Sequence, residues 1–304
     1  MKYTVTIPCY YSEKFLKHTV NTLIVVMDSF AKGDYEIILV NDGSKDKTFQ
    51  VITDLSNENS QVIGIDLLKN VGQHNAIIAG LREATGDIFI NLDDDFQADP
   101  ALIPKLLKAL RDTKQDVVYA NFVNKQYNLF KKITSSMHNH IINWLLYREN
   151  KWFASGFWVA RKVVIEQICK YNSEFTDMQS NFLSTTQNII NVDVPHRDRW
   201  LGNSGYTLKK AIKLWSSTLN YSEKPAVLFI KLGAVLPAIL VIVQLILHLL
   251  KIENFSFLNI ELDIIVGAIF IVGGYLGLLL NRVLKINARV PYITINRIVG
   301  KRQK

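Results

Sequence analysis

Three consecutive carboxylates, Asp93, Asp94 and Asp95, follow a short apolar run, and Gln97 lies two positions after them. Successive side chains on an extended chain alternate between two faces, so Asp93 and Asp95 are expected to point together and Asp94 away from them. Two carboxylates and an amide oxygen suit a hard divalent cation that keeps open positions for phosphate oxygens. The pattern therefore predicts a site for a metal-bound diphosphate, with an acidic loop that caps a helix near Pro100 as the alternative.

The segment 41–48, Asn-Asp-Gly-Ser-Lys-Asp-Lys-Thr, is a second candidate because it follows an apolar run and opens a stretch with helical spacing. As local structure it is a turn in which Ser44 or Asp46 caps the helix. A carboxylate at the end of a strand can also accept the imide N–H of uracil or the amide N–H of guanine. Asp42 is therefore a candidate for recognising a nucleobase.

The segment 8–13, Pro-Cys-Tyr-Tyr-Ser-Glu, follows the first apolar run of the chain. In a nucleotide site, Tyr10 could line the pocket of the base and Glu13 could hold the ribose hydroxyls. A turn with one exposed acid explains the same residues. Cys9 and Cys169 are expected to be free thiols, because they lie far apart in sequence and a cytosolic placement disfavours a disulfide.

Short apolar runs alternate with stretches of helical spacing through residues 1–120, which favours a mostly parallel sheet with helices on both faces. The expected strands are 3–7, 36–40, 62–66, 87–92, 116–119 and 152–160, and the expected helices are 15–30, 48–55, 75–84, 101–110 and 130–147. Ligands bind such sheets at the carboxyl ends of the strands. The three polar segments follow the first, second and fourth strands, so all the candidate chemistry is expected at one edge.

Two apolar runs account for much of the hydrophobic content of the chain, which is 49% of 304 residues. Residues 232–250 carry no formal charge over 19 positions, and residues 264–280 carry none over 17. At 1.5 Å per residue the first run reaches about 28 Å, close to the hydrocarbon thickness of a bilayer. Both runs are apolar on all faces, so membrane spans at about 230–250 and 262–284 are favoured over buried helices of a soluble core.

The flanks of the spans predict their orientation. The connection at 251–261 carries one Lys and two Glu, whereas the tail after the second span carries six Lys or Arg and no acid. The positive-inside rule then places the tail and the N-terminal domain in the cytosol. An amphipathic stretch at 206–222 is expected to lie in the membrane interface, or else to pack on the domain core.

The net charge of +8 suits a domain that lies against anionic lipid and handles phosphorylated substrates. Nucleic acid is not expected as a partner, because the sequence shows no basic stripe interleaved with aromatic residues. The N-terminus enters a strand directly, so no signal peptide is expected.

The motifs occur in a fixed order: Pro8…Tyr10…Glu13, Asp42-Gly43-Ser44…Asp46…Thr48, Asn70-x-Gly72-Gln73…Gly86-Asp87 and Asp93-x-Asp95-x-Gln97…Pro100. In order and spacing the chain resembles family 2 glycosyltransferases with the GT-A fold. Further on it carries Arg199-x-x-Gly202-x-Ser204-x-Tyr206, the amphipathic stretch and the two spans. These features resemble the polyprenyl-phosphate glycosyltransferases, a branch that includes bactoprenol glucosyltransferases and dolichol-phosphate mannosyltransferase. The resemblance covers nearly the whole chain and is weakest between about 150 and 195.

The resemblance implies an α/β domain of the GT-A fold, Rossmann-like with a mostly parallel sheet, at residues 1–225. A two-helix transmembrane hairpin and a basic cytosolic tail would follow at 226–304. The implied donor-binding residues are Pro8, Tyr10, Glu13, Asp42, Gly72, Asp93 and Asp94. Asp93, Asp95 and Gln97 would gather Mg²⁺ or Mn²⁺ with the donor diphosphate.

The resemblance also implies the residues that act on the reacting groups. Asp95 and Arg199 would be catalytic, and Arg199 would close on the diphosphate from a mobile loop. Lys125, Lys131 and Ser135 would hold the acceptor phosphate. A solvated helix face is the alternative for Lys131 and Ser135.

Two departures from the family pattern bear on the mechanism. Relatives usually carry arginines where this chain reads 120–125, so only Lys125 could substitute, as a point charge rather than a bidentate fork. Relatives also tend to have Asp-Phe-Arg where this chain has Gly156-Phe157-Trp158, so a proposed catalytic base is missing. A lipid phosphate is already an anion, and as nucleophile it needs positioning rather than deprotonation.

The expected function is inverting transfer of one sugar from a nucleoside-diphosphate donor, a UDP-sugar, to undecaprenyl or another polyprenyl phosphate at the cytoplasmic membrane face. One alternative is a glycosyltransferase that elongates a lipid-linked or capsular glycan through a sugar hydroxyl. The other is a catalytically silent membrane scaffold for glycan export. The oligomeric state stays open, although relatives can associate through this domain and tail.

Overall fold

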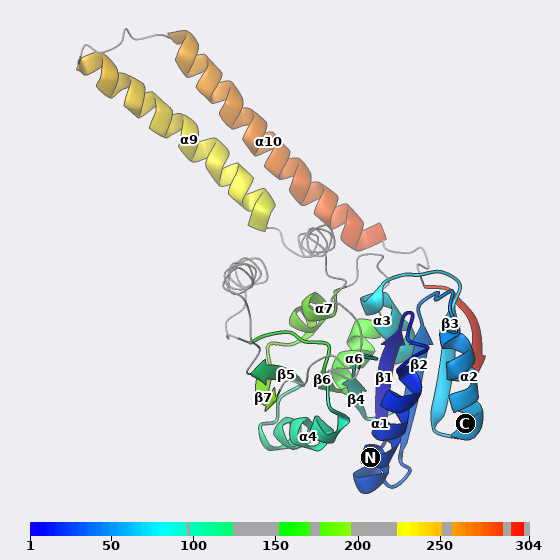
Figure 1. The fold of residues 1–304 in the computed structure, drawn as a ribbon. Helices are drawn as coiled ribbons and strands as arrows, with labels where there is room; N and C mark the ends of the chain where they lie inside the picture. Colours follow the sequence, from blue (N-terminus) through cyan, green and yellow to red (C-terminus); the bar gives the residue numbers. More distant parts are fainter. Residues whose placement is uncertain are drawn as a thin grey trace. The chain divides into compact units, whose positions relative to one another are not determined.

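A computed structural model describes residues 1–95, 98–123, 152–170, 177–195, 224–250, 257–287 and 293–300. Its strands are β1 (Tyr3–Cys9), β2 (Tyr35–Asn41), β3 (Val62–Leu67), β4 (Ile88–Asn91), β5 (Val117–Val123), β6 (Trp158–Arg161), β7 (Ile189–Pro195) and β8 (Ile295–Val299). Its helices are α1 (Leu16–Ala31), α2 (Thr48–Glu58), α3 (Gln73–Glu83), η1 (Pro100–Leu102), α4 (Ile103–Asp112), α6 (Lys162–Cys169), α7 (Met178–Thr185), α9 (Lys224–Leu249) and α10 (Phe257–Asn287). The strands form one sheet in the order β7-β5-β6-β4-β1-β2-β3-β8 (Figure 1).

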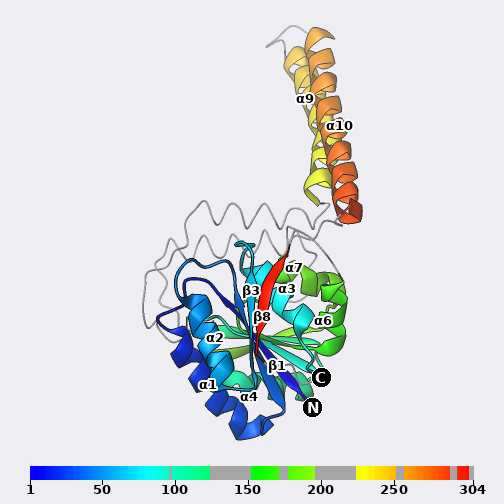
Figure 2. The same cartoon turned by 90° about the vertical axis from the view of Figure 1, so that its right-hand side faces the viewer.

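The centre of the sheet is parallel, as the strand–helix alternation predicts. β1 lies between β2 and β4 and pairs with both in parallel, and β2 pairs with β3 in parallel. β6 and β8 run antiparallel to their neighbours. Helices α1, α2 and α4 cover one face, and α3, α6 and α7 cover the other (Figure 2). The carboxyl ends of β1, β2, β3 and β4 therefore share one edge.

Alternate side chains of β2 enter the two halves of the core, as a strand buried on both faces requires. Ile37 and Leu39 pack in the cluster that contains the apolar side of α1, and Ile38 and Val40 pack in the cluster beneath α3. All four side chains are fully buried. The continuous apolar run therefore reads as a central strand, which is what the sequence predicts.

A buried carboxylate ties the amino ends of the central strands together. Glu36 accepts the Thr4 hydroxyl at 2.6 Å, the Thr85 N–H at 2.6 Å and the Thr85 hydroxyl at 2.9 Å. The Lys2 ammonium lies 3.2 Å from its second oxygen. Burial raises the pKa of Glu36, but the hydrogen bonds from Thr4, Thr85 and Lys2 outweigh it and bring the pKa below its ordinary value.

The expected strands and helices of residues 1–120 are confirmed, with ends that differ by a few residues. The strand expected at 152–160 is shorter, because β6 begins only at Trp158. No strand or helix is expected from the sequence at 171–190, where α7 and the start of β7 lie. The expected helices at 130–147 and 206–222 lie outside the described residues.

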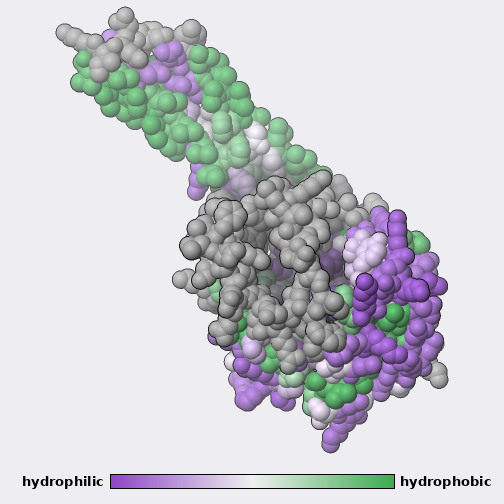
Figure 3. Space-filling model, in the orientation of Figure 1, coloured by the Kyte–Doolittle hydropathy of each residue, from purple (hydrophilic) through white to green (hydrophobic). Residues whose placement is uncertain are grey.

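Helices α9 and α10 pack against each other as a hairpin (Figure 1). Each is long and apolar enough to cross a membrane, and only 6% and 11% of their most apolar windows are buried. Figure 3 shows the apolar surface of this hairpin. Such exposure is typical of spans that face lipid rather than of the core helices of a soluble protein.

Small residues and one polar pair join the two spans. A Cβ on Gly233 would lie 2.5 Å from the Gly267 carbonyl oxygen, and one on Gly274 would lie 2.6 Å from the Ala226 carbonyl oxygen. The backbones therefore approach as closely as small residues in membrane helices allow. The Gln244 amide donates to Asp263 Oδ2 at 2.8 Å across the hairpin.

The chain returns to the sheet after the second span. β8 pairs antiparallel with β3, with Asp66 opposite Arg297. It belongs to the same compact unit as the other strands, whereas α9 and α10 belong to the second unit. The tail, which the sequence analysis groups with the hairpin as a basic segment, thus supplies an edge strand of the sheet.

Candidate active site

The three polar segments lie at the carboxyl ends of β1, β2 and β4, as predicted from their positions after these strands. The Asp42 N–H donates to the Cys9 carbonyl at 2.9 Å, which joins the first two loops. The Tyr11 N–H donates to the Ser44 hydroxyl at 3.1 Å, which joins them again. The sheet therefore brings the described parts of these three segments to one edge, and hydrogen bonds join the first two of them.

Asp94 turns toward the first loop rather than toward open solvent. Its Oδ2 accepts the Ser12 hydroxyl, and it also accepts the Tyr10 N–H at 3.4 Å. Burial raises the pKa of Asp94 to about 6, and the neighbouring Asp95 adds to the rise. This orientation agrees with the alternation expected for the acidic run. Asp94 holds the loop that carries Tyr10, and its assignment to the donor itself stays a prediction.

Asp93 has different partners from Asp94. Its Oδ1 accepts the Gln73 side-chain amide at 2.7 Å, so the start of α3 contacts the acidic run. Its carboxylate also lies against Gly156, where an added Cβ would be 2.5 Å from Oδ1 and 2.6 Å from Cγ. The Gly156 carbonyl accepts the Asn91 amide at 2.6 Å, which fixes the backbone under the carboxylate. Only a glycine leaves room for Asp93 in this position.

Asp42 is buried at the end of β2, where it is 3% exposed. Its Oδ1 accepts the Val71 N–H at 2.7 Å and its Oδ2 accepts the Gly72 N–H at 3.0 Å. Burial raises the pKa of Asp42, and these two hydrogen bonds oppose the rise. Each carboxylate oxygen keeps a second lone pair, so the structural role leaves acceptor capacity for a base N–H.

Two glycines adopt the backbone conformations that this arrangement of loops requires. Gly43 has φ of +65°, and a Cβ there would lie 2.5 Å from the Asn70 nitrogen. Gly72 has φ of +89° and lies directly before α3. Both conformations are unfavourable for residues with a side chain. Gly72 therefore serves the turn that presents its N–H to Asp42, and its contact with a donor stays a prediction.

The aromatic residues of the first loop are accessible. Tyr10 is 50% exposed and Tyr11 is 47% exposed, and their rings meet edge to face at 4.6 Å. Glu13 Oε2 accepts the Lys47 N–H at 2.9 Å, while the Asp46 carboxylate accepts the Thr48 N–H at 3.1 Å. An exposed ring can stack on a base, and a Glu13 carboxylate oxygen can accept a ribose hydroxyl.

Asp93 and Asp95 supply hard oxygen ligands of the kind that Mg²⁺ and Mn²⁺ bind. Among the described residues no cluster of three His, Cys, Asp or Glu side chains could hold a metal ion. The donor set of two carboxylates fits a cation whose other positions are filled by phosphate oxygens and water. Gln97, the third expected ligand, lies outside the described residues, as do Arg199, Lys125, Lys131 and Ser135.

Several residues of the site escape sequence reasoning. Gln73, Ser12 and Gly156 each contact the acidic run, a role that no sequence pattern predicts for them. His74 accepts the Met178 N–H at 2.8 Å through Nδ1. That bond ties α3 to α7, which supports a structural role for the histidine. The motif around Gly72 is the one signal that marks Gln73.

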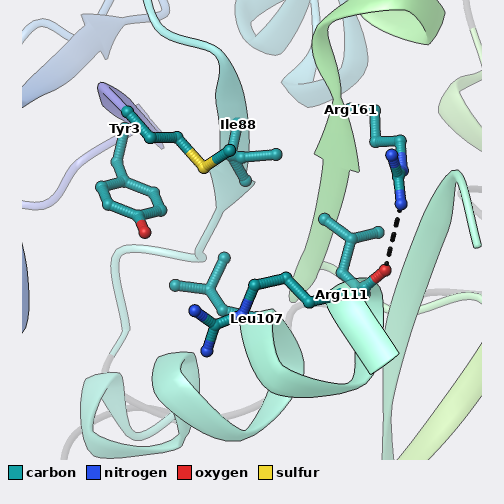
Figure 4. A pocket seen from close by; sticks show the side chains of 7 residues that line it. Tyr3, Ile88, Leu107, Arg111 and Arg161 are labelled. Atoms are coloured by element: carbon teal, nitrogen blue, oxygen red, sulfur yellow. Dashed lines mark hydrogen bonds between the residues drawn. The ribbon is translucent and has the colours of Figure 1, made fainter. Parts of the chain in front are cut away.

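A partly open pocket lies at the opposite end of the strands (Figure 4). Tyr3 and Ile88, at the starts of β1 and β4, line it together with Leu107 and Arg111. The Arg161 guanidinium donates to the Leu110 carbonyl at 3.4 Å beside it. This hollow is remote from the carboxyl edge and takes no part in the candidate site.

Two relatives align with almost the entire chain. Undecaprenyl-phosphate 4-deoxy-4-formamido-L-arabinose transferase from Photorhabdus laumondii subsp. laumondii is 30% identical over 98% of this chain and 94% of its own. The protein of the same name from Proteus mirabilis is 31% identical over the same shares.

Solved structures share the fold of the sheet domain. Glucosyl-3-phosphoglycerate synthase from Mycobacterium tuberculosis, in complex with Mn²⁺, UDP and phosphoglyceric acid, superposes with a TM-score of 0.52 at 15% identity. The match covers 72% of this chain and 76% of that one. A further mycobacterial protein superposes with a TM-score of 0.53 at 15% identity over 73% and 74% of the two chains. Residues 4–169 match the family described as Glycosyl transferase family 2. The chain belongs to glycosyl transferase family 2.

Proposed function

We propose that this protein transfers one sugar from a UDP-sugar to undecaprenyl phosphate, or a closely related polyprenyl phosphate, at the cytoplasmic face of a membrane. The observation that carries the proposal is the similarity over 98% of the chain to transferases named for undecaprenyl phosphate. That similarity includes both apolar helices and the returning strand, not only the sheet domain. A membrane hairpin suits an enzyme whose acceptor is a lipid headgroup.

The reaction is a direct displacement. An oxygen of the acceptor phosphate attacks the anomeric carbon, the bond from that carbon to the diphosphate oxygen breaks, and UDP leaves with the bonding electron pair. The attack comes from the face opposite the leaving group, so an α-linked donor gives a β-linked product. The acceptor is an anion at neutral pH, so no side chain has to remove a proton, in keeping with the glycine at position 156.

The residues of the carboxyl edge bind and orient the donor. Asp42 would accept a base N–H, Tyr10 would stack on the base and Glu13 would hold the ribose. Asp93 and Asp95 would hold Mg²⁺ or Mn²⁺, which when bound neutralises charge on the leaving diphosphate. Arg199 would contact the same diphosphate. Lys125, Lys131 and Ser135 would hold the acceptor phosphate.

The fold supports the expected placement of the domain. β8 follows the second span and pairs with β3, so the chain must return to the side of the membrane on which the sheet lies. Two spans achieve this return. The basic tail then shares the cytosolic side with the sheet domain under the positive-inside rule. Nucleotide sugars are made in the cytosol, which is where such a site would find its donor.

Membranes that contain the protein test the proposal. They are incubated with Mg²⁺ or Mn²⁺, short polyprenyl phosphates and a panel of UDP-sugars that includes the 4-deoxy-4-formamido-L-arabinose donor, and the lipid product is identified by mass. We expect one glycosyl polyprenyl phosphate, lost in Asp95→Ala and retained in Asp54→Ala, a change of an exposed carboxylate on α2. Sugar added only to a glycan hydroxyl, or no release of UDP from any donor, would refute the proposal.

A further inference from the structure

A buried carboxylate at the end of β3 has three donors around it. Asp66 is 7% exposed. It accepts the Asn41 side-chain amide at 2.7 Å, the Asn296 side-chain amide at 3.0 Å and the Arg297 Nε–H at 3.2 Å. Asn41 ends β2, whereas Asn296 and Arg297 lie on β8. Asp66 thus joins the strand that follows the membrane hairpin to the strand that precedes the candidate base site.

Strand β8 is fixed on both sides of this carboxylate. The Arg297 guanidinium lies over the ring of Phe49 on α2 at 4.2 Å, which adds a cation–π contact. The Leu68 N–H donates to the Thr294 carbonyl at 3.1 Å beyond the end of β3. A Cβ on Gly64 would lie 2.7 Å from Val299, so this glycine admits the returning strand. The strand is therefore held in register with Asp66.

The orientation of the Asn41 amide follows from chemistry. A carboxylate can only accept, so the amide nitrogen of Asn41 must face Asp66. The amide oxygen then faces the Ser44 N–H, which it accepts at 3.3 Å. Ser44 in turn accepts the Tyr11 N–H at 3.1 Å. A continuous series of contacts therefore runs from β8 through Asp66 and Asn41 to the turn of Asp42 and the aromatic loop.

We propose that Asp66, Asn296 and Arg297 are positioning residues for the donor nucleotide. Through Asn41 they set the turn that carries Asp42, so the strand that returns from the membrane hairpin controls the affinity of the site for the nucleotide. The inference rests on the proposed function, because it assigns the base and ribose to this turn. It predicts that the three side chains affect donor binding and leave the acceptor phosphate unaffected.

Loss of one partly buried hydrogen bond to Asp66 is expected to weaken nucleotide binding by roughly 5- to 20-fold. Calorimetry of the purified full-length protein with UDP, and with GDP as a comparison, measures the dissociation constant. Steady-state transfer separates the KM for the donor from kcat and from the KM for the lipid phosphate. We expect Arg297→Ala and Asn296→Ala to raise the UDP dissociation constant and the donor KM in parallel, with kcat and acceptor KM within about threefold of wild type.

Two variants separate positioning from general damage. Ile298→Thr changes a neighbouring residue of β8 that is 38% exposed and outside this network, so UDP binding should stay as in wild type. Arg297→Lys keeps a donor for Asp66 and should recover most of the affinity. The Arg297 side chain is 59% exposed, so the Arg297→Ala protein is expected to stay folded. Its melting temperature, compared with that of wild type, checks this.

The outcomes separate this inference from the proposed function. If wild type transfers sugar and binds UDP, but Arg297→Ala and Asn296→Ala bind UDP equally well, the positioning role is wrong and the function stands. If Ile298→Thr loses affinity as much as Arg297→Ala, the strand acts only by supporting the fold, and the positioning role is again wrong. If wild type binds neither UDP nor GDP and transfers no sugar, the proposed function itself fails.

Discussion

Gly156→Ala is expected to disable the enzyme while leaving it folded. The added methyl group would lie 2.5 Å from Asp93 Oδ1 and 2.6 Å from its Cγ, whereas ordinary contacts begin at 3.4 Å. Oδ2 lies nearer still, so the carboxylate must move by at least about 0.9 Å, the shortfall measured at Oδ1. Its hydrogen bond from Gln73 would break or lengthen with that movement.

The size of the effect follows from the tolerance of the site. A metal ligand must lie within about 0.2 Å of its proper distance, and a misplacement of about 1 Å in an active site can cost roughly 100-fold in rate. We therefore expect kcat/KM to fall about 100-fold, which corresponds to about 2.7 kcal/mol of transition-state stabilisation. The free energy of unfolding should change by less than about 1 kcal/mol, because only the end of a flexible side chain has to move.

The assay is sugar transfer to polyprenyl phosphate by purified protein, with a thermal melt and Mn²⁺ binding as companion measurements. Gly273→Ala on α10 is the matched control, since a Cβ there meets nothing within 4 Å. Wild-type affinity for Mn²⁺ and transfer within about threefold of wild type in Gly156→Ala would show that Asp93 is not held as a ligand in this position.

Three further changes test other contacts. Asp94→Ala removes the acceptor that holds the loop of Tyr10 and Tyr11, so the donor KM should rise about tenfold. Asp94→Asn keeps an acceptor oxygen, so its donor KM should stay within about threefold of wild type. Equal donor KM values for the two variants would contradict this role of Asp94. Glu36 has a pKa below its ordinary value, because the hydrogen bonds to it outweigh the effect of its burial. It therefore stabilises the fold above the unfolded pKa of 4.5, and that stability is lost as pH falls through the folded pKa. The melting temperature of Glu36→Gln should accordingly lie below that of wild type at pH 7 and approach it toward pH 3. A difference in melting temperature that does not change with pH would refute the assignment. Gln244→Leu removes the hydrogen bond to Asp263 and should destabilise the hairpin by about 1 kcal/mol, measured by thermal unfolding in detergent. Sugar transfer at 25 °C should not change. An unchanged melting temperature would show that the bond contributes nothing to stability.

Local patterns predict most of the sheet and the edge where the site lies. The apolar run of β2 predicts a strand buried on both faces, and the acidic run after β4 predicts the edge of the sheet where the site lies. Both predictions are possible because period and chain order determine which side chains share a face or an edge. Asp93 and Asp94 have different partners, as the expected alternation predicts, but both lie beyond the end of β4 at Asn91, so the strand pleat does not set their directions.

Contacts between residues far apart in sequence cannot be predicted from local sequence patterns. β8 is short and carries Asn and Arg on exposed positions, so its pattern does not distinguish a strand from a basic tail. Its pairing depends on an acceptor edge that lies more than 220 residues earlier. β6 begins only at Trp158, after Gly156 and its close approach to Asp93, and no local preference encodes that contact.

The place of β8 in the sheet has a consequence for biosynthesis. Ribosomes make a chain from its amino end, so this last strand emerges after both apolar helices have been synthesised. Until β8 pairs with it, the outer edge of β3 has unpaired backbone N–H and C=O groups, with which strands of other chains can pair. The proposed role of β8 therefore implies that the turn of Asp42 reaches its final geometry only after both apolar helices have been synthesised.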